Sequence, residues 1–326
     1  MKTRKLGKTG LDVSEIGLGC WQFGGDFGPM EDDRAADTMT AAEDAGVNFF
    51  DTADVYGDGR SESLIGAYTK DRTERPVIAT KVGRSARLYP DTYDKASIRE
   101  HLLRSAERLG VEKLDLVQLH CIPPVHLKDG DVFDIMQELC AEGICRNWGA
   151  SVETIEEAHM CLAHEGCSTL QIIFNLFRQD AVRDLLPAAS KAGVGIIVRL
   201  PLASGLLTGK FSANESFPET DHRNYNADGA AFSVGETFNG IPLKIGVELV
   251  EELKTFVPDG MTLADFALRW ILDHEAVSTV IAGCSRPDQV TANARASTLP
   301  ALSGELHRAL SDYYLDQVRE TIRCPI

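Results

Sequence analysis

Three short apolar runs end in a side chain that can exchange a proton or stabilise charge, and a tyrosine lies close to one of them. Asp51, Lys81 and His120 end the runs, and Tyr56 comes shortly after Asp51. A lysine ammonium beside a phenol stabilises the phenolate, which lowers the tyrosine pKa and makes a usable acid near neutral pH. We therefore expect Tyr56 to donate a proton, with Lys81 held beside it by Asp51. His120 would donate a hydrogen bond to an oxygen that gains negative charge.

Each of these residues also has a structural interpretation. Asp51 could cap a helix, Lys81 could be a solvated strand end, and Tyr56 could simply pack in the core. His120 could be a hydrogen-bonded core histidine. Their joint occurrence at or beside the ends of successive runs favours the chemical interpretation.

The elements that would position these residues are eight β-branched or aromatic runs, with helical spacing in the segments between them. Strands that alternate with helices pair in parallel, and eight units close a (β/α)8 TIM barrel, whereas doubly wound sheets more often have fewer strands. Catalytic groups of such a barrel lie at the C-terminal ends of its strands. We predict strands over 16–18, 49–51, 77–80, 114–119, 147–150, 170–174, 195–200 and 279–282.

Two segments lie outside this alternation, and we predict a single domain over 1–326. Residues 3–13 contain a turn at 7–10, which predicts a hairpin that closes the bottom of the barrel. Between Gly209 and Gly240 the chain is rich in Gly, Asn, Ser and Pro but carries five aromatic residues. Long loops are usually functional or disordered, and the rings favour an ordered flap over the mouth. A surface loop anchored by those rings is the alternative.

The composition limits the classes of partner. A formal charge of -16 argues against nucleic acid and anionic membranes, because both are bound through positive surface. A phosphate-bearing small molecule is compatible with this charge, since a few donors at a helix N-terminus suffice. No apolar leader or membrane-spanning run is visible, so we expect a cytoplasmic protein. The eight cysteines lack the paired spacing of a zinc site, and we expect reduced thiols and no metal.

The segment that starts at Phe49 reads FFDTADVYGDGRSE and resembles the signature of the aldo-keto reductase superfamily. Lys81 and His120 match the remaining catalytic positions of that superfamily. The similarity runs nearly end to end and includes the opening RKLGKTGL and the later PLASGLLTGK, which makes it far more specific than a lone motif. The resemblance implies an NADP(H)-dependent oxidoreductase of the carbonyl reductase or alcohol dehydrogenase type, which reduces an aldehyde or ketone with a proton from Tyr56.

The resemblance also implies which residues bind the cofactor. Ser151 and Gln171 fall on the positions that bind the nicotinamide carboxamide, and Asp51 lies near the nicotinamide ribose. The loop after the seventh strand would wrap the pyrophosphate, and a helix start after the eighth would hold the adenosine phosphate. The residues implied for these two parts are Leu202, Ser204, Gly205, Leu207 and Lys210, then Gly283, Cys284, Ser285, Arg286, Gln289 and Asn293.

Arg286 decides the choice of dinucleotide in this interpretation. A guanidinium binds a 2′-phosphate through two parallel hydrogen bonds, and Ser285 and Gln289 add donors. We interpret Asp288 as a cap of its own helix rather than as a ligand of a free ribose. A solvated arginine at a helix start is the alternative for Arg286. The sequence thus predicts a preference for NADPH over NADH.

Three positions depart from the family pattern. Val152 stands where an Asn often follows Ser151, and Ala292 replaces a Glu beside the adenine site. Arg199 stands where many members stack an aromatic ring on the nicotinamide. A guanidinium can also lie flat on a ring, but its charge disfavours oxidised nicotinamide.

Aromatic residues would line a substrate pocket at the mouth of the barrel. We expect Trp21, Phe23 and Trp148, together with the flap aromatics, to form an apolar pocket around one polar corner. Such a pocket suits a small-molecule aldehyde or ketone. Packing at the barrel rim is the alternative for both tryptophans.

Two other functions are compatible with the same fold. Lys81 could form a Schiff base in an aldolase, although Asp51 favours its ammonium form. The chain could also be a cofactor-binding regulatory protein with slow turnover, similar to the potassium-channel β-subunit branch of the superfamily. The presence of all four catalytic residues favours the reductase.

Overall fold

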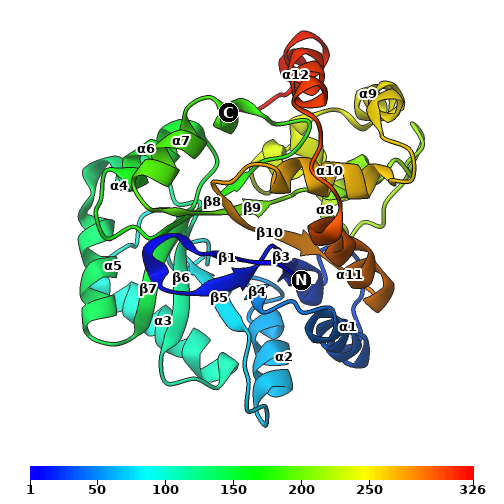
Figure 1. The fold of residues 1–326 in the computed structure, drawn as a ribbon. Helices are drawn as coiled ribbons and strands as arrows, with labels where there is room; N and C mark the ends of the chain where they lie inside the picture. The colour runs from blue at the N-terminus through cyan, green and yellow to red at the C-terminus, as the bar shows by residue number, and fades with distance from the viewer.

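The computed structural model describes residues 1–326 and contains a closed barrel of eight parallel strands, which confirms the predicted fold. The strands follow chain order around the barrel, and the last one closes the ring by pairing with the first and the seventh. Figure 1 shows the strands in the middle of the molecule with helices around them. The barrel strands are β3 (Ile16–Gly19), β4 (Phe49–Asp51), β5 (Val77–Val82), β6 (Leu114–His120), β7 (Cys145–Ser151), β8 (Thr169–Ile173), β9 (Gly195–Arg199) and β10 (Val277–Gly283).

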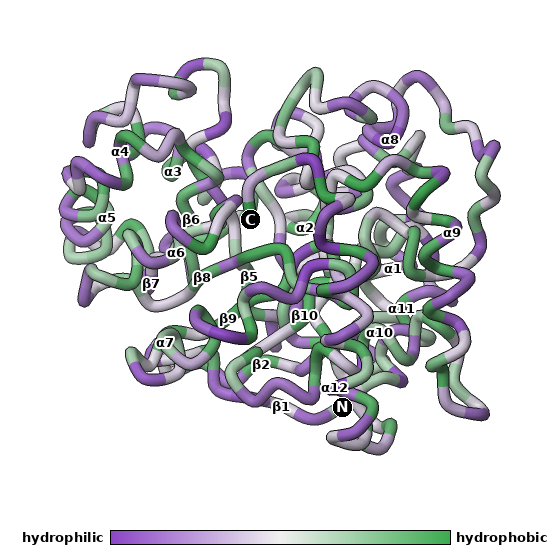
Figure 2. Tube along the Cα trace, turned by 90° about the horizontal axis from the view of Figure 1, so that it is seen from above, coloured by the Kyte–Doolittle hydropathy of each residue, from purple (hydrophilic) through white to green (hydrophobic).

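Helices cover the outside of the barrel, and α3 (Lys95–Leu109) shows how the sequence forms them. The Asp94 side chain caps its first turn by accepting from the Ser97 N–H at 3.0 Å, and Gly110 ends it in the left-handed conformation. The alternating green and purple of the outer helices in Figure 2 reflects their amphipathic pattern. None of the helices has the length and apolar character that crossing a bilayer requires. The others are α1 (Asp32–Asp44), α2 (Arg60–Thr69), α4 (Pro124–Asp129), α5 (Asp131–Ala141), α6 (Ile155–Leu162), α7 (Leu185–Lys191), α8 (His222–Tyr225), α9 (Leu243–Leu253), α10 (Leu263–Leu272), α11 (Pro287–Ala294) and α12 (Gly304–Tyr313).

The interior of the barrel has an apolar layer that supports a polar layer nearer the mouth. The strand residues of the apolar layer are Phe49, Ala79, Leu116, Ile197 and Ile281. Side chains alternate along a strand, so the residue two positions further on also points inward. Those residues are Asp51, Lys81, Gln118, Arg199 and Gly283. The polar groups thus stand at the C-terminal ends of the strands, on a packed apolar base.

The N-terminal hairpin closes the bottom of the barrel, as predicted. Its strands β1 (Thr3–Lys5) and β2 (Asp12–Ser14) pair antiparallel, and Leu6 and Val13 pack into the apolar layer of the interior. Gly7 has a φ of +50°, and a Cβ there would lie 2.2 Å from the backbone nitrogen of Gly195. A glycine is therefore required where the turn meets the strand ends.

The segment from Gly209 to Gly240, which we call the flap, is ordered over the mouth of the barrel. It contains α8, and the rings of Phe211, Phe217 and Phe238 pack together with centroids 5.4 to 6.1 Å apart. A hydrogen bond connects the flap to the loop after β3: the Tyr225 hydroxyl donates to the Asp26 carboxylate at 2.9 Å. The structure therefore shows the ordered flap that the aromatic content favoured.

Candidate active site

The four residues expected to act in proton transfer come together at the ends of β4, β5 and β6. Lys81 Nζ donates to Asp51 Oδ1 at 2.5 Å and to the Thr52 carbonyl oxygen at 2.8 Å, and it lies 3.4 Å from Tyr56 Oη. The ring centroids of Tyr56 and His120 are 5.9 Å apart, with nearly perpendicular planes. Asp51, Lys81 and His120 are all buried. A phenol thus lies beside an ammonium group that a carboxylate holds in place.

The pKa of Tyr56 is raised, whereas the sequence predicted that it would be lowered. Burial raises the pKa of Tyr56 to about 12, and the Lys81 ammonium opposes this increase without overcoming it. The carboxylates of Asp51 and Glu236 add to the increase. The expected lowering of the pKa is therefore wrong in net direction, although Lys81 acts with the expected sign. The phenol is protonated at neutral pH, which is the form that a proton donor needs.

Lys81 is charged and His120 is uncharged at neutral pH. Burial alone would lower the pKa of Lys81, but the Asp51 carboxylate and Tyr56 outweigh it, and the pKa is raised. Burial, with the cations Arg84 and Lys81, holds the pKa of His120 well below its usual value. Lys81 is therefore an ammonium, and His120 is a neutral imidazole that can donate one hydrogen bond.

Asp51 has two further partners inside the barrel. Its Oδ2 accepts from Gln118 Nε2 at 3.1 Å and from Gln171 Nε2 at 2.8 Å. Ser151 Oγ donates to Gln171 Oε1 at 3.4 Å, so the two residues expected at the carboxamide are connected to the proton-transfer group. Gln118 was not predicted from the sequence. The spacing could have identified it, because Gln118 stands two residues before His120 and therefore on the same inward face of the strand.

A cleft of about 540 Å³ runs from this group to the start of α11 and contains most of the residues expected at the cofactor. Leu207 and Cys284 are exceptions, because their side chains are buried in the core and do not line the cleft. Their assignment to the cofactor site therefore stays a prediction, limited to their backbone atoms. The expected residues that do line it are Asp51, Ser151, Gln171, Arg199, Leu202, Ser204, Gly205, Lys210, Gly283, Ser285, Arg286, Gln289 and Asn293.

The loop after β9 has a backbone that suits a phosphate group. Left-handed φ values between +47° and +95° occur at Leu200, Ala203, Ser204 and Gly205. Non-glycine residues rarely adopt this conformation, and such strain is concentrated at ligand-binding loops. Turns of this kind can direct backbone N–H groups toward one anion. The loop therefore fits the pyrophosphate of a dinucleotide.

The other end of the cleft fits a polar ring. Two buried nitrogen atoms there, Nδ1 of His120 and Nε of Arg199, have no hydrogen-bond partner within the protein. Unpartnered buried polar atoms are costly, so they are expected where a ligand binds rather than in a packed core. This end also holds Tyr56, and it therefore fits a nicotinamide placed for reaction with a carbonyl.

The start of α11, where we expect the adenosine phosphate, differs from the expectation in one respect. Arg286 Nε and Nη2 donate to the two carboxylate oxygens of Asp288, at 2.9 and 3.1 Å. Asp288 therefore does not cap its helix with its side chain; it pairs with Arg286, because the guanidinium lies within reach two residues earlier. The Ser285 N–H and hydroxyl both donate to Gln289 Oε1, at 2.8 and 3.2 Å. These donors would have to exchange partners to bind a phosphate.

Arg199 does not stand alone at the position where an aromatic ring is common. Its Nη2 donates to the Val152 carbonyl oxygen at 3.0 Å, and its guanidinium lies 3.3 and 3.7 Å from the carboxylates of Glu153 and Glu236. Both carboxylates also pair with Arg84. The sequence did not reveal Arg84, Glu153 and Glu236 as site residues, because they follow three different strands and no spacing relates them.

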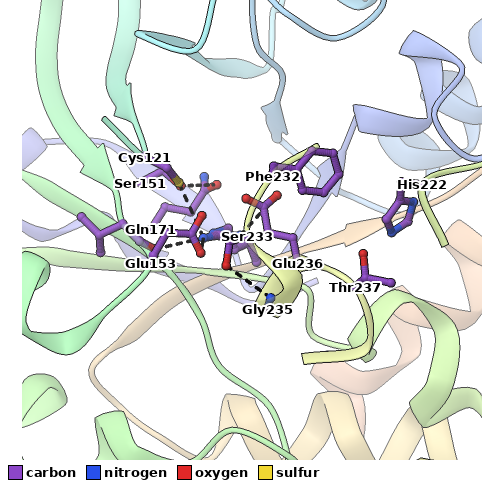
Figure 3. A network of polar contacts seen from close by, with 12 residues as sticks. Cys121, Ser151, Glu153, Gln171, His222, Phe232, Ser233, Gly235, Glu236 and Thr237 are labelled. Atoms are coloured by element: carbon purple, nitrogen blue, oxygen red, sulfur yellow. Dashed lines mark hydrogen bonds and ion pairs between the residues drawn. The ribbon is translucent and has the colours of Figure 1, made fainter. Parts of the chain in front are cut away.

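Figure 3 shows the two carboxylate residues of this group, Glu236 on the flap and Glu153 on the loop after β7. Cys121 lies against the same carboxylates, and the sulfur and one oxygen of each carboxylate lie within 4.8 Å of one another. Because Arg84 and Arg199 already pair with the carboxylates, the arrangement favours a charge network over a cation site. We call Arg84, Arg199, Glu153 and Glu236 the four-charge group.

A second pocket of about 430 Å³ adjoins the cleft, and Trp21, Tyr56 and His120 line both. The Trp21 ring stacks on Tyr56 with centroids 5.8 Å apart. Phe232 of the flap lies at the edge of Trp21 and also lines this pocket. The second pocket therefore gives a small molecule access to Tyr56, the expected proton donor.

Trp148 and Phe23 do not line either pocket, and their assignment to the substrate pocket is wrong. Trp148 is 2% exposed and stacks on Phe133 of α5. It stands three residues before Ser151, so strand alternation points it outward, toward the helices. Phe23 is fully buried in the main core.

Comparisons with known proteins agree with the fold. A putative voltage-gated potassium channel subunit beta from Schizosaccharomyces pombe is 32% identical over 311 residues, which are 90% of this chain and 87% of that protein. The NADH-specific methylglyoxal reductase of Escherichia coli is 28% identical over 315 residues, 91% and 93% of the two chains. The structure of glycerol dehydrogenase from Gluconobacter oxydans has a TM-score of 0.79 and 27% identity over 99% and 97% of the chains. The Aldo/keto reductase family model matches residues 15–313, and the chain belongs to that family.

Proposed function

We propose that this protein reduces an aldehyde or ketone to the alcohol, with NADPH as the hydride donor and Tyr56 as the proton donor. Members of the family are oxidoreductases that use nicotinamide cofactors. The observation that carries the proposal is the contact of Lys81 with both Asp51 and Tyr56, beside His120. Tyr56 and His120 stand where the cleft meets the second pocket. Hydride donor and carbonyl could meet at that point.

Each of the four residues has a distinct part in the proposed reaction. A bound reduced nicotinamide would supply the hydride to the carbonyl carbon. Tyr56 Oη gives its proton to the carbonyl oxygen, and the Lys81 ammonium stabilises the phenolate that remains. Neutral His120 donates a hydrogen bond to the same oxygen as negative charge accumulates there. Asp51 keeps Lys81 charged and in place.

The preference for NADPH depends on the adenosine end of the cleft. Arg286 would exchange its pairing with Asp288 for two charge-assisted hydrogen bonds to a 2′-phosphate. Ser285 and Gln289 would supply further donors. The E. coli relative named as NADH-specific makes this choice worth testing directly.

The relative named as a channel subunit supports a second candidate, a cofactor-binding regulatory protein with slow turnover. The complete set of four residues favours the enzyme instead. A Schiff-base aldolase is disfavoured, because Lys81 is held as an ammonium between Asp51, Thr52 and Tyr56 and so lacks the lone pair of a nucleophile.

NADPH oxidation with short aldehydes, dicarbonyls, sugars and aromatic aldehydes tests the proposal. We expect turnover with at least one of these classes, and loss of that turnover in Tyr56→Phe. NADPH binding without turnover across the panel would support the regulatory candidate. Borohydride trapping of a carbonyl compound on Lys81 would support the aldolase.

A further inference from the structure

Glu236 connects the flap to the barrel through the four-charge group. One of its oxygens lies 2.5 Å from Arg84 Nη2 and the other lies 3.7 Å from Arg199 Nη1. Glu153 contacts the same two guanidinium groups, at 3.1 and 3.3 Å. None of the four side chains is more than 19% exposed. The group is neutral when both carboxylates are ionised.

Within this group, Glu236 holds its negative charge more firmly than Glu153. Burial alone would raise the pKa of Glu236, but Arg84 and Arg199 hold that pKa well below its usual value. Burial raises the pKa of Glu153, Arg199 offsets only part of the increase, and Glu236 adds to it. Glu236 is therefore the principal negative charge between the two guanidinium groups.

Arg199 brings the four-charge group to the end of the cleft that contains the proton donor. Arg199 and Glu236 line the cleft together with Tyr56 and Gln171. A nicotinamide placed for reaction beside Tyr56 would therefore lie next to the Arg199 guanidinium and near the Glu236 carboxylate.

The charge beside a nicotinamide distinguishes its two redox forms. The oxidised ring carries one positive charge, whereas the reduced ring carries none. Charges near the ring therefore change the affinity for the oxidised form, while contacts with the phosphates and adenosine are common to both forms. A guanidinium without its carboxylate would repel the oxidised ring.

We propose that Glu236 determines the relative affinity of the site for oxidised and reduced nicotinamide, by cancelling the charge of Arg199. This inference rests on the proposed function, because it requires a nicotinamide at this end of the cleft. It explains how Arg199 can replace an aromatic ring without excluding the oxidised cofactor. It also means that the flap, which carries Glu236, contributes to the redox balance of the bound cofactor.

The test measures the dissociation constants of NADP⁺ and NADPH for the parent and for Glu236→Gln, by quenching of tryptophan fluorescence. We expect the variant to weaken NADP⁺ relative to NADPH by roughly tenfold, because one guanidinium charge is no longer cancelled. The same ratio should change equally for NAD⁺ and NADH, since the 2′-phosphate lies at the far end. Arg199→Met should shift the ratio in the opposite direction. Glu248→Gln, on the exposed face of α9, controls for the loss of one surface charge and should leave the ratio unchanged.

Equal weakening of both redox forms in Glu236→Gln would mean that Glu236 only holds the flap, and the proposal would be overturned. Glu236→Asp keeps the charge and should keep the ratio within about twofold; a ratio as altered as in Glu236→Gln would also overturn it. If Glu236→Gln does not fold, an unchanged ratio of the NADP⁺ and NADPH dissociation constants in Arg199→Met would overturn the proposal. A parent that binds none of the four dinucleotides would instead refute the proposed function, so the two failures are distinguishable.

Discussion

Different kinds of contact stabilise the two ends of the cleft, where we propose that the nicotinamide and the adenosine bind. At the nicotinamide end, Asp51 and Lys81 are 2% and 1% exposed and are bonded across neighbouring strands. At the adenosine end, Arg286 and Asp288 are 53% and 68% exposed and pair with each other on one short segment. Buried charges keep one arrangement, whereas an exposed pair contributes little to stability and exchanges partners readily. The residues of the proposed chemistry are therefore preorganised. The choice of dinucleotide depends instead on whether Arg286 pairs with Asp288 or with a 2′-phosphate.

Tyr56→Phe should show the largest effect, because it removes the proton donor from the preorganised end. We expect kcat for carbonyl reduction to fall by roughly 100- to 10,000-fold, as is usual for the loss of a general acid. The affinity for NADPH should be nearly unchanged, since the phenol does not hold the dinucleotide. Steady-state kinetics and a fluorescence titration measure the two quantities. Turnover at the parental rate would require a different proton donor.

Lys81→Met tests the same end through the pKa of Tyr56. Lys81 opposes the increase that burial causes, so its removal should raise the pKa of Tyr56 further. Alcohol oxidation needs the phenolate as a base, so the rise of kcat/KM with pH should shift to higher pH. The rate of alcohol oxidation near neutral pH should fall by about tenfold for each unit by which the pKa of Tyr56 rises. An unchanged pH profile would contradict the pairing.

Lys81→Met also leaves Asp51 buried without its cation, which can cost about 3–5 kcal/mol of folding free energy. The double variant Asp51→Asn with Lys81→Met is the matched control for this effect. It should recover much of the thermal stability and none of the activity. Circular dichroism melts of the two variants separate the loss of fold from the loss of chemistry.

At the adenosine end, Arg286→Ala should weaken NADPH more than NADH, by roughly 1–3 kcal/mol if the arginine binds the 2′-phosphate. Asp288→Asn is the complementary variant, because it frees Arg286 and removes a nearby negative charge. We expect it to strengthen NADPH by roughly two- to fivefold and to leave NADH unchanged. Titration of both dinucleotides checks each variant. Equal losses for the two in Arg286→Ala would remove this segment as the 2′-phosphate site.

The smallest expected effect concerns the flap, which lies between the two ends. Ser204 Oγ donates to the Glu236 carbonyl oxygen at 3.0 Å, so a dinucleotide on the loop after β9 should stabilise the flap as well. We expect NADPH to slow tryptic cleavage at Lys210 and Arg223 several-fold. Cleavage between Lys70 and Arg75, between α2 and β5, is an internal control. Equal cleavage of the flap with and without NADPH would contradict this stabilisation of the flap by the cofactor.

The prediction of the barrel from the sequence succeeded because each strand leaves a short local pattern. The boundaries were less accurate, and β7 begins at Cys145 rather than Asn147, while β10 begins at Val277 rather than Thr279. Cys145 pairs with Leu114, and Val277 pairs with Ile196. Strand ends depend on the neighbouring strand, which a local pattern does not describe.

The sequence also contains information that the predictions did not use: side chains along a strand point alternately inward and outward. Counting by twos from Ser151 assigns Trp148 to the outer face, and counting back from His120 assigns Gln118 to the inner face. Both assignments agree with the structure, where Trp148 stacks on Phe133 and Gln118 donates to Asp51. The spacing therefore contained both facts.

The sequence by itself determined the barrel, the convergence of Asp51, Tyr56, Lys81 and His120, and the sign of the effect of Lys81 on Tyr56. These follow from local patterns and from the rule that parallel strands end on the same face. Only the tertiary structure decided the net pKa of Tyr56, because burial depends on every element around the ring. It also decided the pairing of Glu236 with Arg84, whose positions are 152 residues apart. No local pattern describes such a contact, because the folded barrel and the flap bring the two side chains together.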